Sequence, residues 1–268
     1  MSMIELLGYI SAVVIGFSLG LIGGGGSILT VPALVYLVGV SPVLSTSYSL
    51  FVVGASALVG SFTYMKQGLV SYKTALVFAV PSFIAVYATR RWIVPAIPEE
   101  ILTVDSFVLT KDVAVMVFFA ILMALASFSM IRSGKQEQMI EHPIILLNYP
   151  MTVLVGAVFG VLAGVVGAGG GFLIIPALVI LAKLPMKLAV GTSLLIIAAK
   201  SLVGFGGDIG VQPIDWTFLL TFTAIAVVGI FAGTYVSRYV TGKKLKTGFG
   251  WFVLVMAVYI LVNELIIT

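Results

Sequence analysis

The sequence lacks most of the residues on which enzymes and soluble domains depend. It has no cysteine, which excludes disulfides, thiolate metal sites and cysteine nucleophiles, and it has one histidine. Only 9% of its 268 residues are charged, where a soluble domain carries about a quarter, and 61% are hydrophobic. This balance predicts a polytopic membrane protein.

Motifs for energy conversion and catalysis are missing as well. The chain contains no GxxxxGK[ST] motif, and its basic turn TGKKLKTG is typical of a membrane interface that contacts lipid. The hydrophobic segments hold almost no acid or base and no metal-ligand cluster. We therefore expect no enzyme, no cofactor, no metal site and no nucleic-acid partner.

The chain has instead a series of hydrophobic segments of helical length, five in each half. Eight are long enough to cross a bilayer core of about 30 Å, and two have only 11–12 residues. We expect an all-α polytopic membrane protein with about eight full transmembrane helices and two short broken or re-entrant half-helices. The expected segments are 3–22, 28–39, 43–65, 72–94, 111–132, 148–166, 172–182, 187–206, 215–238 and 246–267.

The two halves repeat each other at an offset of 144 positions. GLIGGGGSILTVPALVYL, beginning at Gly20, aligns with GVVGAGGGFLIIPALVIL, beginning at Gly164, and 17 of 41 consecutive positions are identical. Shared apolar composition does not align a glycine cluster and a proline in register. The pattern predicts a tandem duplication, with a membrane repeat over 1–132, a cytoplasmic connector over 133–147 and a second membrane repeat over 148–268.

The distribution of basic residues indicates how the repeats are oriented. If each long and short pair returns the chain to its starting side, ten Lys and Arg residues gather on one side, in loops 66–73, 132–148, 183–187 and 238–246. If each pair is one kinked span, the basic residues divide nine to four. The first arrangement fits the positive-inside rule better. It predicts an inverted structural repeat, typical of secondary transporters, with both termini outside the plasma (inner) membrane.

Glycine clusters precede both short helices. Glycine lets an anion approach bare backbone N–H groups, and a helix N-terminus carries about half a positive charge. We therefore expect the clusters to form one anion cradle near the middle of the membrane. Its predicted members are Gly23, Gly24, Gly25, Gly26, Ser27, Gly167, Ala168, Gly169, Gly170 and Gly171. The alternative is tight helix packing, which we assign to two pairs outside the clusters. These pairs are Gly16 with Gly20 and Gly160 with Gly164.

Lys200 lies about 13 residues into a predicted span, too deep for its ammonium group to reach either surface easily. A charge at that depth costs at least about 2.5–3.5 kcal/mol on insertion scales and indicates a function. We predict that Lys200 binds the anion. The alternative is that it binds carbonyl groups of the broken helices.

Hydroxyl side chains provide further donors. They bind oxyanions without adding negative charge, although in membrane helices they also bond to their own backbone. The candidate ligands are Thr46, Ser47, Ser49, Thr192 and Ser193. Charges near the predicted outer ends of spans are treated separately. Arg90 and Arg91 are assigned to the outer side, and Asp208 to a helix end or loop rather than to an entrance of the transport path.

These motifs resemble the sulfite exporter TauE/SafE family. The resemblance rests on GLIGGGGSILTVPAL and GVLAGVVGAGGGFLIIPALV, on the Thr-Ser helices that follow them and on SLVGFGG, and it covers nearly the whole chain. It implies a transporter of sulfur-containing anions such as sulfite, sulfoacetate and related organosulfonates. It also implies that both glycine clusters and the adjacent hydroxyls lie near the substrate.

The sequence therefore predicts a secondary transporter that moves sulfite or an organosulfonate by alternating access, driven by protons or by the membrane potential. The alternatives are a passive anion channel with the same cradle and a transporter of a non-sulfur carboxylate or other small anion. The expected partners are the small anion, membrane lipid and protons as the coupling ion. A homo-oligomer is compatible with the sequence.

Overall fold

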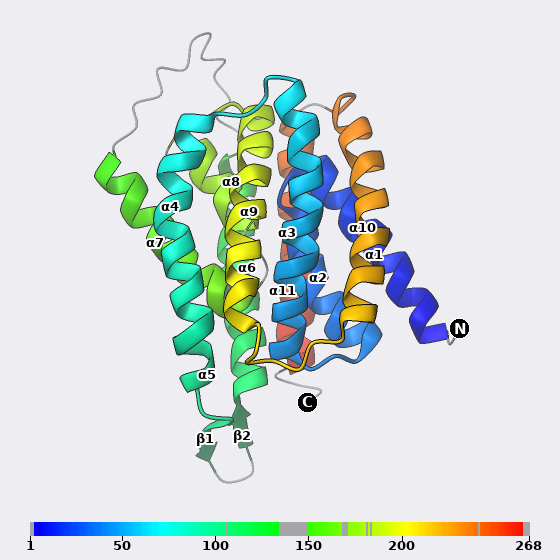
Figure 1. The fold of residues 1–268 in the computed structure, drawn as a ribbon, viewed down its shortest axis with the longest axis vertical. Helices are drawn as coiled ribbons and strands as arrows, with labels where there is room; N and C mark the ends of the chain where they lie inside the picture. Colours follow the sequence, from blue (N-terminus) through cyan, green and yellow to red (C-terminus); the bar gives the residue numbers. More distant parts are fainter. Residues whose placement is uncertain are drawn as a thin grey trace.

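The molecule is a bundle of long helices that lie roughly along one axis (Figure 1). A small β-hairpin projects from one end, which we call the hairpin end. The structure is a computed structural model, and it describes residues 3–104, 107–133, 149–167, 171–180, 182, 184–240 and 242–264. The prediction of a helical membrane protein is confirmed.

Helices account for nearly all of the described chain. The first half contains α1 (Met3–Ile22), α2 (Gly25–Pro32), the π-helix η1 (Ala33–Val38), α3 (Pro42–Lys66), α4 (Tyr72–Ala88), the π-helix η2 (Thr89–Ile93), α5 (Val94–Ala96), β1 (Glu100–Val104), β2 (Phe107–Thr110) and α6 (Lys111–Ser133). The second half contains α7 (Tyr149–Val166), α8 (Gly171–Ile180), α9 (Met186–Asp208), α10 (Trp216–Ser237) and α11 (Gly242–Val262). Each predicted hydrophobic segment coincides with a helix to within a few residues.

The connection between α5 and α6 contains the hairpin. Strands β1 and β2 pair antiparallel, with Glu100 opposite Thr110 and Val104 opposite Phe107. The runs EILTV and FVLT are rich in residues that favour strands, a local preference that the search for helix-length segments did not consider. The chain is thus helical apart from this hairpin over the part that the structure describes.

Five of the described helical stretches are long and apolar enough to cross a membrane: Pro42–Lys66, Tyr72–Ala96, Lys111–Phe128, Met186–Asp208 and Trp216–Ser237. Four others are apolar but shorter. Large apolar side chains cover the outside of the bundle, and Leu76, Ile84 and Val228 are 66%, 69% and 67% exposed. Such a surface needs lipid around it, so the chain is a multi-pass membrane protein. The expected count of eight full spans stays a prediction.

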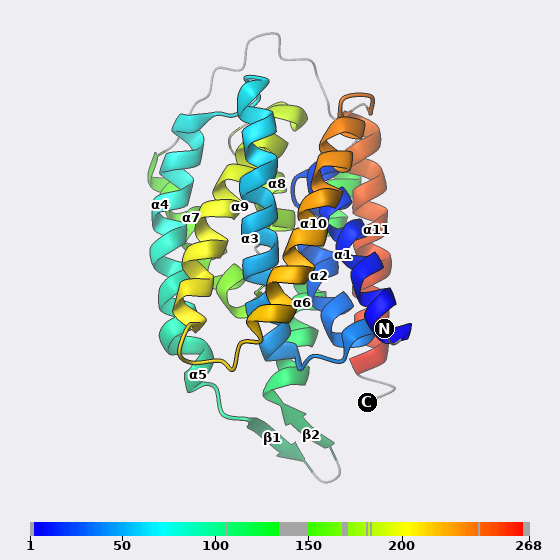
Figure 2. The same cartoon turned by 45° about the vertical axis from the view of Figure 1, so that its right-hand side comes forward.

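The short helices return the chain to the end from which it came. Both α1 and α3 begin at the hairpin end, so α2 and η1 lead back there (Figures 1 and 2). In the second half α7 and α9 both begin at the opposite end, and α8 leads back to that end. The chain takes the course that the distribution of charge favoured.

Glycines allow the closest helix crossings. Helix α1 packs along α10, and α7 packs along α4. A Cβ atom on Gly16 or Gly20 would collide with backbone of α10, and one on Gly160 would lie 2.7 Å from a carbonyl oxygen of α4. At Gly164 it would lie 2.7 Å from Thr89 of η2. The packing role predicted for these two pairs is confirmed.

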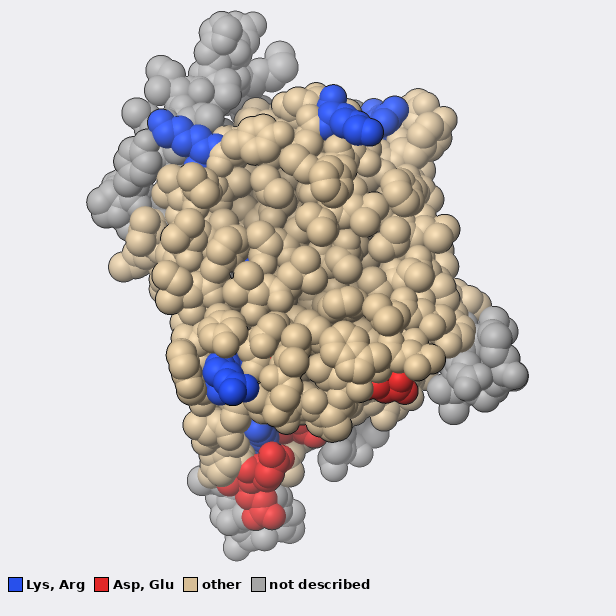
Figure 3. Space-filling model, viewed as in Figure 1, with Lys and Arg blue, Asp and Glu red and all other residues tan. Residues whose placement is uncertain are grey.

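Charge divides between the ends of the bundle. Lys and Arg side chains gather at the end opposite the hairpin, whereas Asp and Glu gather near the hairpin, together with a smaller number of basic residues (Figure 3). We call the first the basic end. Helix ends bring four exposed basic residues there, which are Lys66, Lys73, Lys187 and Arg238.

Candidate functional site

Each half is interrupted at a glycine with a left-handed backbone. Gly23 (φ +79°) follows α1 and Gly167 (φ +68°) follows α7. Their N–H groups still donate to helix carbonyls, those of Leu19 at 2.7 Å and Ala163 at 2.8 Å. Only glycine adopts this conformation without strain, and it commonly ends helices. The two clusters therefore end α1 and α7 at positions 144 residues apart.

The two interruptions lie against each other inside the bundle. A Cβ atom on Gly24 would lie 2.5 Å from the carbonyl carbon of Gly171, and one on Gly171 would lie 2.7 Å from the Gly24 Cα. Backbone touches backbone here because neither residue has a side chain. The predicted cradle members Ala168, Gly169 and Gly170 lie outside the described residues.

Each interruption also contacts the central helix of the other half. A Cβ atom on Gly23 would lie 2.7 Å from Val190 Cγ1 and 3.0 Å from Ser193 Oγ, both on α9. A Cβ atom on Gly167 would overlap Thr46 on α3. Positions 46 and 190 are again 144 residues apart. The centre of the bundle is thus formed by both interruptions together with α3 and α9.

The start of α2 leaves backbone donors without a side-chain cap. The helix begins at Gly25, its N-cap Gly24 makes no capping hydrogen bond through a side chain, and the Ser27 hydroxyl donates back to the Gly24 carbonyl at 2.6 Å. The first N–H groups of a helix have no partner within it, and an anion satisfies them. Gly26 has a different role, because a Cβ there would meet Ile15 and Leu19 of α1. It packs one helix on another.

Two of the predicted hydroxyl ligands bond to their own helices. Thr46 donates to the Val43 carbonyl at 2.6 Å, and Ser193 donates to the Val190 carbonyl at 2.8 Å. Thr192 serves the turn before α4, since its Oγ1 accepts the Ser71 N–H at 2.9 Å. For Thr46 and Ser193, this bonding to their own helix is the alternative that the sequence left open.

Two predicted hydroxyl ligands on α3, Ser47 and Ser49, make no short hydrogen bond to their own helix. The Ser47 hydroxyl is 3.5 Å from the Val43 carbonyl, a long hydrogen bond. The Ser49 hydroxyl is buried and has no hydrogen-bond partner among the described residues. Ser49 is therefore the predicted hydroxyl with a donor most free for a ligand.

Lys200 is fully buried on α9, and its Nζ makes no hydrogen bond or ion pair within the described part of the chain. Three residues before it, Ile197 Cδ1 lies 2.6 Å from the Cβ position of Gly171. Lys200 thus begins about one helical turn from the meeting point of the interruptions. Burying an ammonium group without a partner is costly, and Lys200 makes no hydrogen bond to a described carbonyl group of the broken helices.

Arg90 is a second buried cation, which the sequence analysis assigned to the outer side. Its exposure is 0%, and its Nη2 lies directly against the Cβ position of Gly167. Its Nη1 lies 3.4 Å from Asp208 Oδ2, and Asp208 is only 1% exposed. Asp208 ends α9, as predicted, and Arg90 lies in η2 at the hairpin end. The sequence did not indicate that both residues are buried and paired with each other.

The sequence contains a signal that Arg90 and Arg91 lie in different surroundings. Arg90 and Arg91 stand side by side within the apolar segment 72–94, and neighbouring helix residues point in different directions. The structure buries Arg90 and exposes Arg91. Position along the span alone, on which the assignment to the outer side rested, does not distinguish them.

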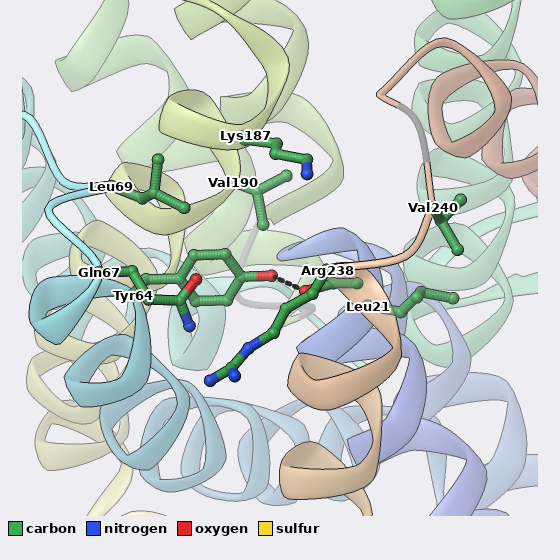
Figure 4. Close-up of a pocket in the computed structure, with 9 residues that line it drawn as sticks. Leu21, Tyr64, Gln67, Leu69, Lys187, Val190, Arg238 and Val240 are labelled. Carbon is green, nitrogen blue, oxygen red and sulfur yellow. Dashed lines mark hydrogen bonds between the residues drawn. The ribbon is translucent and has the colours of Figure 1, made fainter.

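At the basic end a cavity of about 210 Å³ reaches toward the first interruption (Figure 4). Among its lining residues Lys187 and Arg238 are exposed, whereas Tyr64 and Val190 are buried. Val190 also contacts Gly23, so the floor of the cavity adjoins the interruption. The sequence does not indicate this cavity, because the cavity forms between α3, α9 and α10, which are far apart in the chain.

Tyr64 closes the floor of the cavity by a hydrogen-bond bridge. Its hydroxyl lies 2.9 Å from the Gly20 carbonyl oxygen of α1 and 2.9 Å from Ser237 Oγ of α10. Figure 4 shows a hydrogen bond of the Tyr64 hydroxyl as a dashed line. At the repeat offset the position equivalent to Tyr64 is Asp208. Equivalent positions in the two halves thus make different contacts, the hydrogen bonds of Tyr64 and the ion pair of Asp208.

Comparison with known proteins adds a family to this geometry. Residues 9–260 match the family described as sulfite exporter TauE/SafE. The chain is 30% identical over 251 residues to a probable membrane transporter protein of Xylella fastidiosa, covering 92% of this chain and 91% of that protein. It is 27% identical over 265 residues to the probable membrane transporter protein YunE of Bacillus subtilis, covering 89% and 92% of the two chains. No solved structure matches the chain significantly.

Proposed function

Because the chain belongs to the sulfite exporter TauE/SafE family, we propose that it is a secondary transporter for a small sulfur-containing oxyanion, either sulfite or an organosulfonate such as sulfoacetate. The observation that carries this proposal is the buried, unpartnered Lys200 ammonium close to the contact between Gly24 and Gly171. A cation beside bare backbone and an uncapped helix start suits an anion. The relatives named as probable membrane transporters agree with this class of function.

The proposal includes an inverted structural repeat. Matching helices pack in matching ways, since α1 lies along α10 as α7 lies along α4, and α3 contacts α10 as α9 contacts α4. The central pairs, α3 with α9 and α2 with α8, join each helix to its own counterpart. This pattern and the 144-residue offset support two repeats of opposite orientation around the anion cradle.

The proposal of alternating access is supported by the difference between the two ends. The cavity reaches the first interruption from the basic end, whereas the buried Arg90–Asp208 pair lies beside the second interruption. In this proposal the structure is open toward the basic end. During transport the basic end closes and the hairpin end opens. Since basic residues favour the cytoplasm, the basic end faces the cytoplasm of the plasma (inner) membrane, and both termini lie outside.

The energy for transport would come from an ion gradient or the membrane potential, with protons as the candidate coupling ion. The family resemblance and the cradle leave the anion open within the class of small oxyanions. A passive channel or a carrier of non-sulfur carboxylates uses the same chemistry. Both are therefore outcomes of the test.

The test measures thermal stabilisation of the detergent-purified protein by sulfite, sulfate, thiosulfate, sulfoacetate, taurine, acetate, phosphate and chloride. A ligand at one hundred times its Kd stabilises the folded state by about 2.7 kcal/mol, or about 5–10 °C for a chain of this size. We expect this shift from one sulfur oxyanion, and we expect Lys200→Met to abolish it. Lys66→Met removes an exposed lysine at the basic end and serves as the control, with binding unchanged.

Flux measurements in vesicles complete the test. A secondary transporter gives uptake that saturates with substrate and accelerates when substrate is present on the opposite side. Flux that rises linearly with concentration, without counter-transport, would identify a channel. Selective stabilisation by acetate rather than by a sulfur oxyanion would identify a carboxylate carrier. Stabilisation by none of these anions would remove the anion cradle altogether.

A further inference from the structure

The second glycine interruption carries a buried guanidinium group that the predicted cradle did not include. Arg90 lies in η2, where the helix at the end of α4 widens to a π-helix, a feature frequent at functional sites. A Cβ on Gly164 of α7 would lie 2.7 Å from Thr89 Cβ, and one on Gly207 of α9 would lie 3.0 Å from Arg90 Cβ. Arg90 is thus held between α7 and α9, with its Nη2 against Gly167.

The donors of this guanidinium group have no hydrogen-bond acceptor among the described residues. Arginine has five N–H donors, yet Nε, Nη1 and Nη2 make no hydrogen bond to any described residue. The ion pair to Asp208 is 3.4 Å long, beyond the usual length of a charge-assisted hydrogen bond. A fully buried side chain with free donors beside a glycine interruption is the arrangement of a ligand-binding group.

We propose that Arg90 is a ligand of the transported anion at the second interruption, and that the Asp208 carboxylate competes with the anion for it. This inference rests on the proposed function. The guanidinium fork binds two oxygens of an oxyanion in parallel, which matches the sulfonate or sulfite group. The Asp208 carboxylate offers the same pair of oxygens and holds the guanidinium in place until the anion replaces it.

Competition between Asp208 and the anion for Arg90 accounts for a difference in sequence between the two halves. At the repeat offset, Arg90 corresponds to Thr234 and Asp208 corresponds to Tyr64. Only the second interruption therefore has a cation and a competing carboxylate. Arg90 and Lys200 are the two side chains with a basic group that are 0% exposed among the described residues, and Lys200 has no paired carboxylate there.

The experiment compares the Kd of sulfite and of sulfoacetate for purified variants. We expect Arg90→Gln to weaken binding about tenfold or more, because it removes a charged hydrogen-bonding partner. We expect Asp208→Asn to tighten binding about threefold or more, because it removes the competing carboxylate. Arg91→Gln removes the neighbouring exposed arginine and leaves the Kd unchanged.

The double variant separates competition from simple structural support. If Asp208 acts through Arg90, the double variant Arg90→Gln/Asp208→Asn binds as weakly as Arg90→Gln alone. The double variant also removes both buried charges, so it provides a folded protein where Arg90→Gln alone leaves an uncompensated carboxylate and misfolds. Size-exclusion chromatography of each variant identifies misfolding.

Three results would overturn the inference. Asp208→Asn weakening binding would make the ion pair a structural support. A double variant that binds more tightly than wild type would show that Asp208 acts without Arg90. Wild-type binding that depends on Lys200 but is unaffected by either single substitution would remove Arg90 from the site and leave the proposed function standing. If the wild type binds none of the anions, the proposed function itself fails.

Discussion

At the scale of single residues, the glycines of the two clusters differ in what a side chain would meet. A Cβ on Gly24 would collide with backbone of the other interruption, which cannot move without moving α8. A Cβ on Gly26 would press against α1 instead. The glycine cluster 23–26 therefore contains residues with separate roles. Gly24 lies at the contact between the two halves, and Gly26 packs α2 against α1.

We expect Gly24→Ala to separate the two interruptions and to weaken anion binding. Overpacking of a close contact costs about 1–3 kcal/mol, so the apparent melting temperature should also fall by several degrees. The measurement is thermal unfolding with and without sulfite. Gly206→Ala is the matched control, since a Cβ there meets nothing within 4 Å, and it should leave both properties unchanged. Equal effects of the two substitutions would contradict the contact between the interruptions.

The sequence identified one of the two basic side chains that are 0% exposed among the described residues, Lys200 and Arg90. Lys200 stands in the middle of its span, where burial follows from depth alone. Arg90 stands near the end of a segment, where a side chain reaches solvent unless a neighbouring element covers it. Arg90 is covered by α7 and α9, which follow it in the chain by more than fifty residues. It also lies in a π-helical turn, which no residue pattern predicts.

At the scale of helices, Tyr64 joins three elements. It belongs to α3, and its hydroxyl lies 2.9 Å from the Gly20 carbonyl of α1 and 2.9 Å from Ser237 of α10. The bond to Gly20 reaches the last turn of α1, just before the first interruption. Tyr64 therefore links the floor of the cavity to α1, the helix that ends at the first interruption.

We expect Tyr64→Phe to lower the apparent melting temperature by about 2–4 °C. The lost hydrogen bonds are worth about 1 kcal/mol net, and the Gly20 carbonyl loses a partner in a buried setting. Thermal unfolding of the purified protein provides the measurement. Tyr72→Phe makes the same chemical change at a side chain that is 60% exposed, and its melting temperature should equal that of the wild type. A wild-type value for Tyr64→Phe would show that the bridge contributes no stability.

Helix boundaries were predictable because local signals set them. Pro42 begins α3, and Asp215 caps α10 by accepting the Phe218 N–H at 3.1 Å. The return of each short helix was predictable from the loops that carry Lys and Arg, a property of the whole chain. The hairpin was missed because its strands lie outside the bundle, where the pattern of helix-length apolar segments gives no information.

At the scale of the whole molecule, the two ends are built from equivalent positions that carry different residues. Val190 lines the cavity at the basic end, and its counterpart Thr46 lies against Gly167 near the Arg90 guanidinium. If the repeats exchange roles during transport, these positions should also exchange their access to solvent. The absence of cysteine makes this measurable, because any introduced thiol is the only one in the chain.

We expect Val190→Cys to react with a membrane-impermeant maleimide added from the basic end, and Thr46→Cys to be protected from reagent on either side. The minor conformation of a two-state protein holds about 0.1–10% of the molecules, so the rates should differ by at least about tenfold. Saturating sulfite or sulfoacetate should slow Val190→Cys and, as the molecule opens the other way, speed Thr46→Cys from the hairpin end. Inside-out and right-side-out vesicles distinguish the two directions. Simultaneous reaction of Val190→Cys from one side and Thr46→Cys from the other at equal rates would indicate a continuous pore, which alternating access forbids.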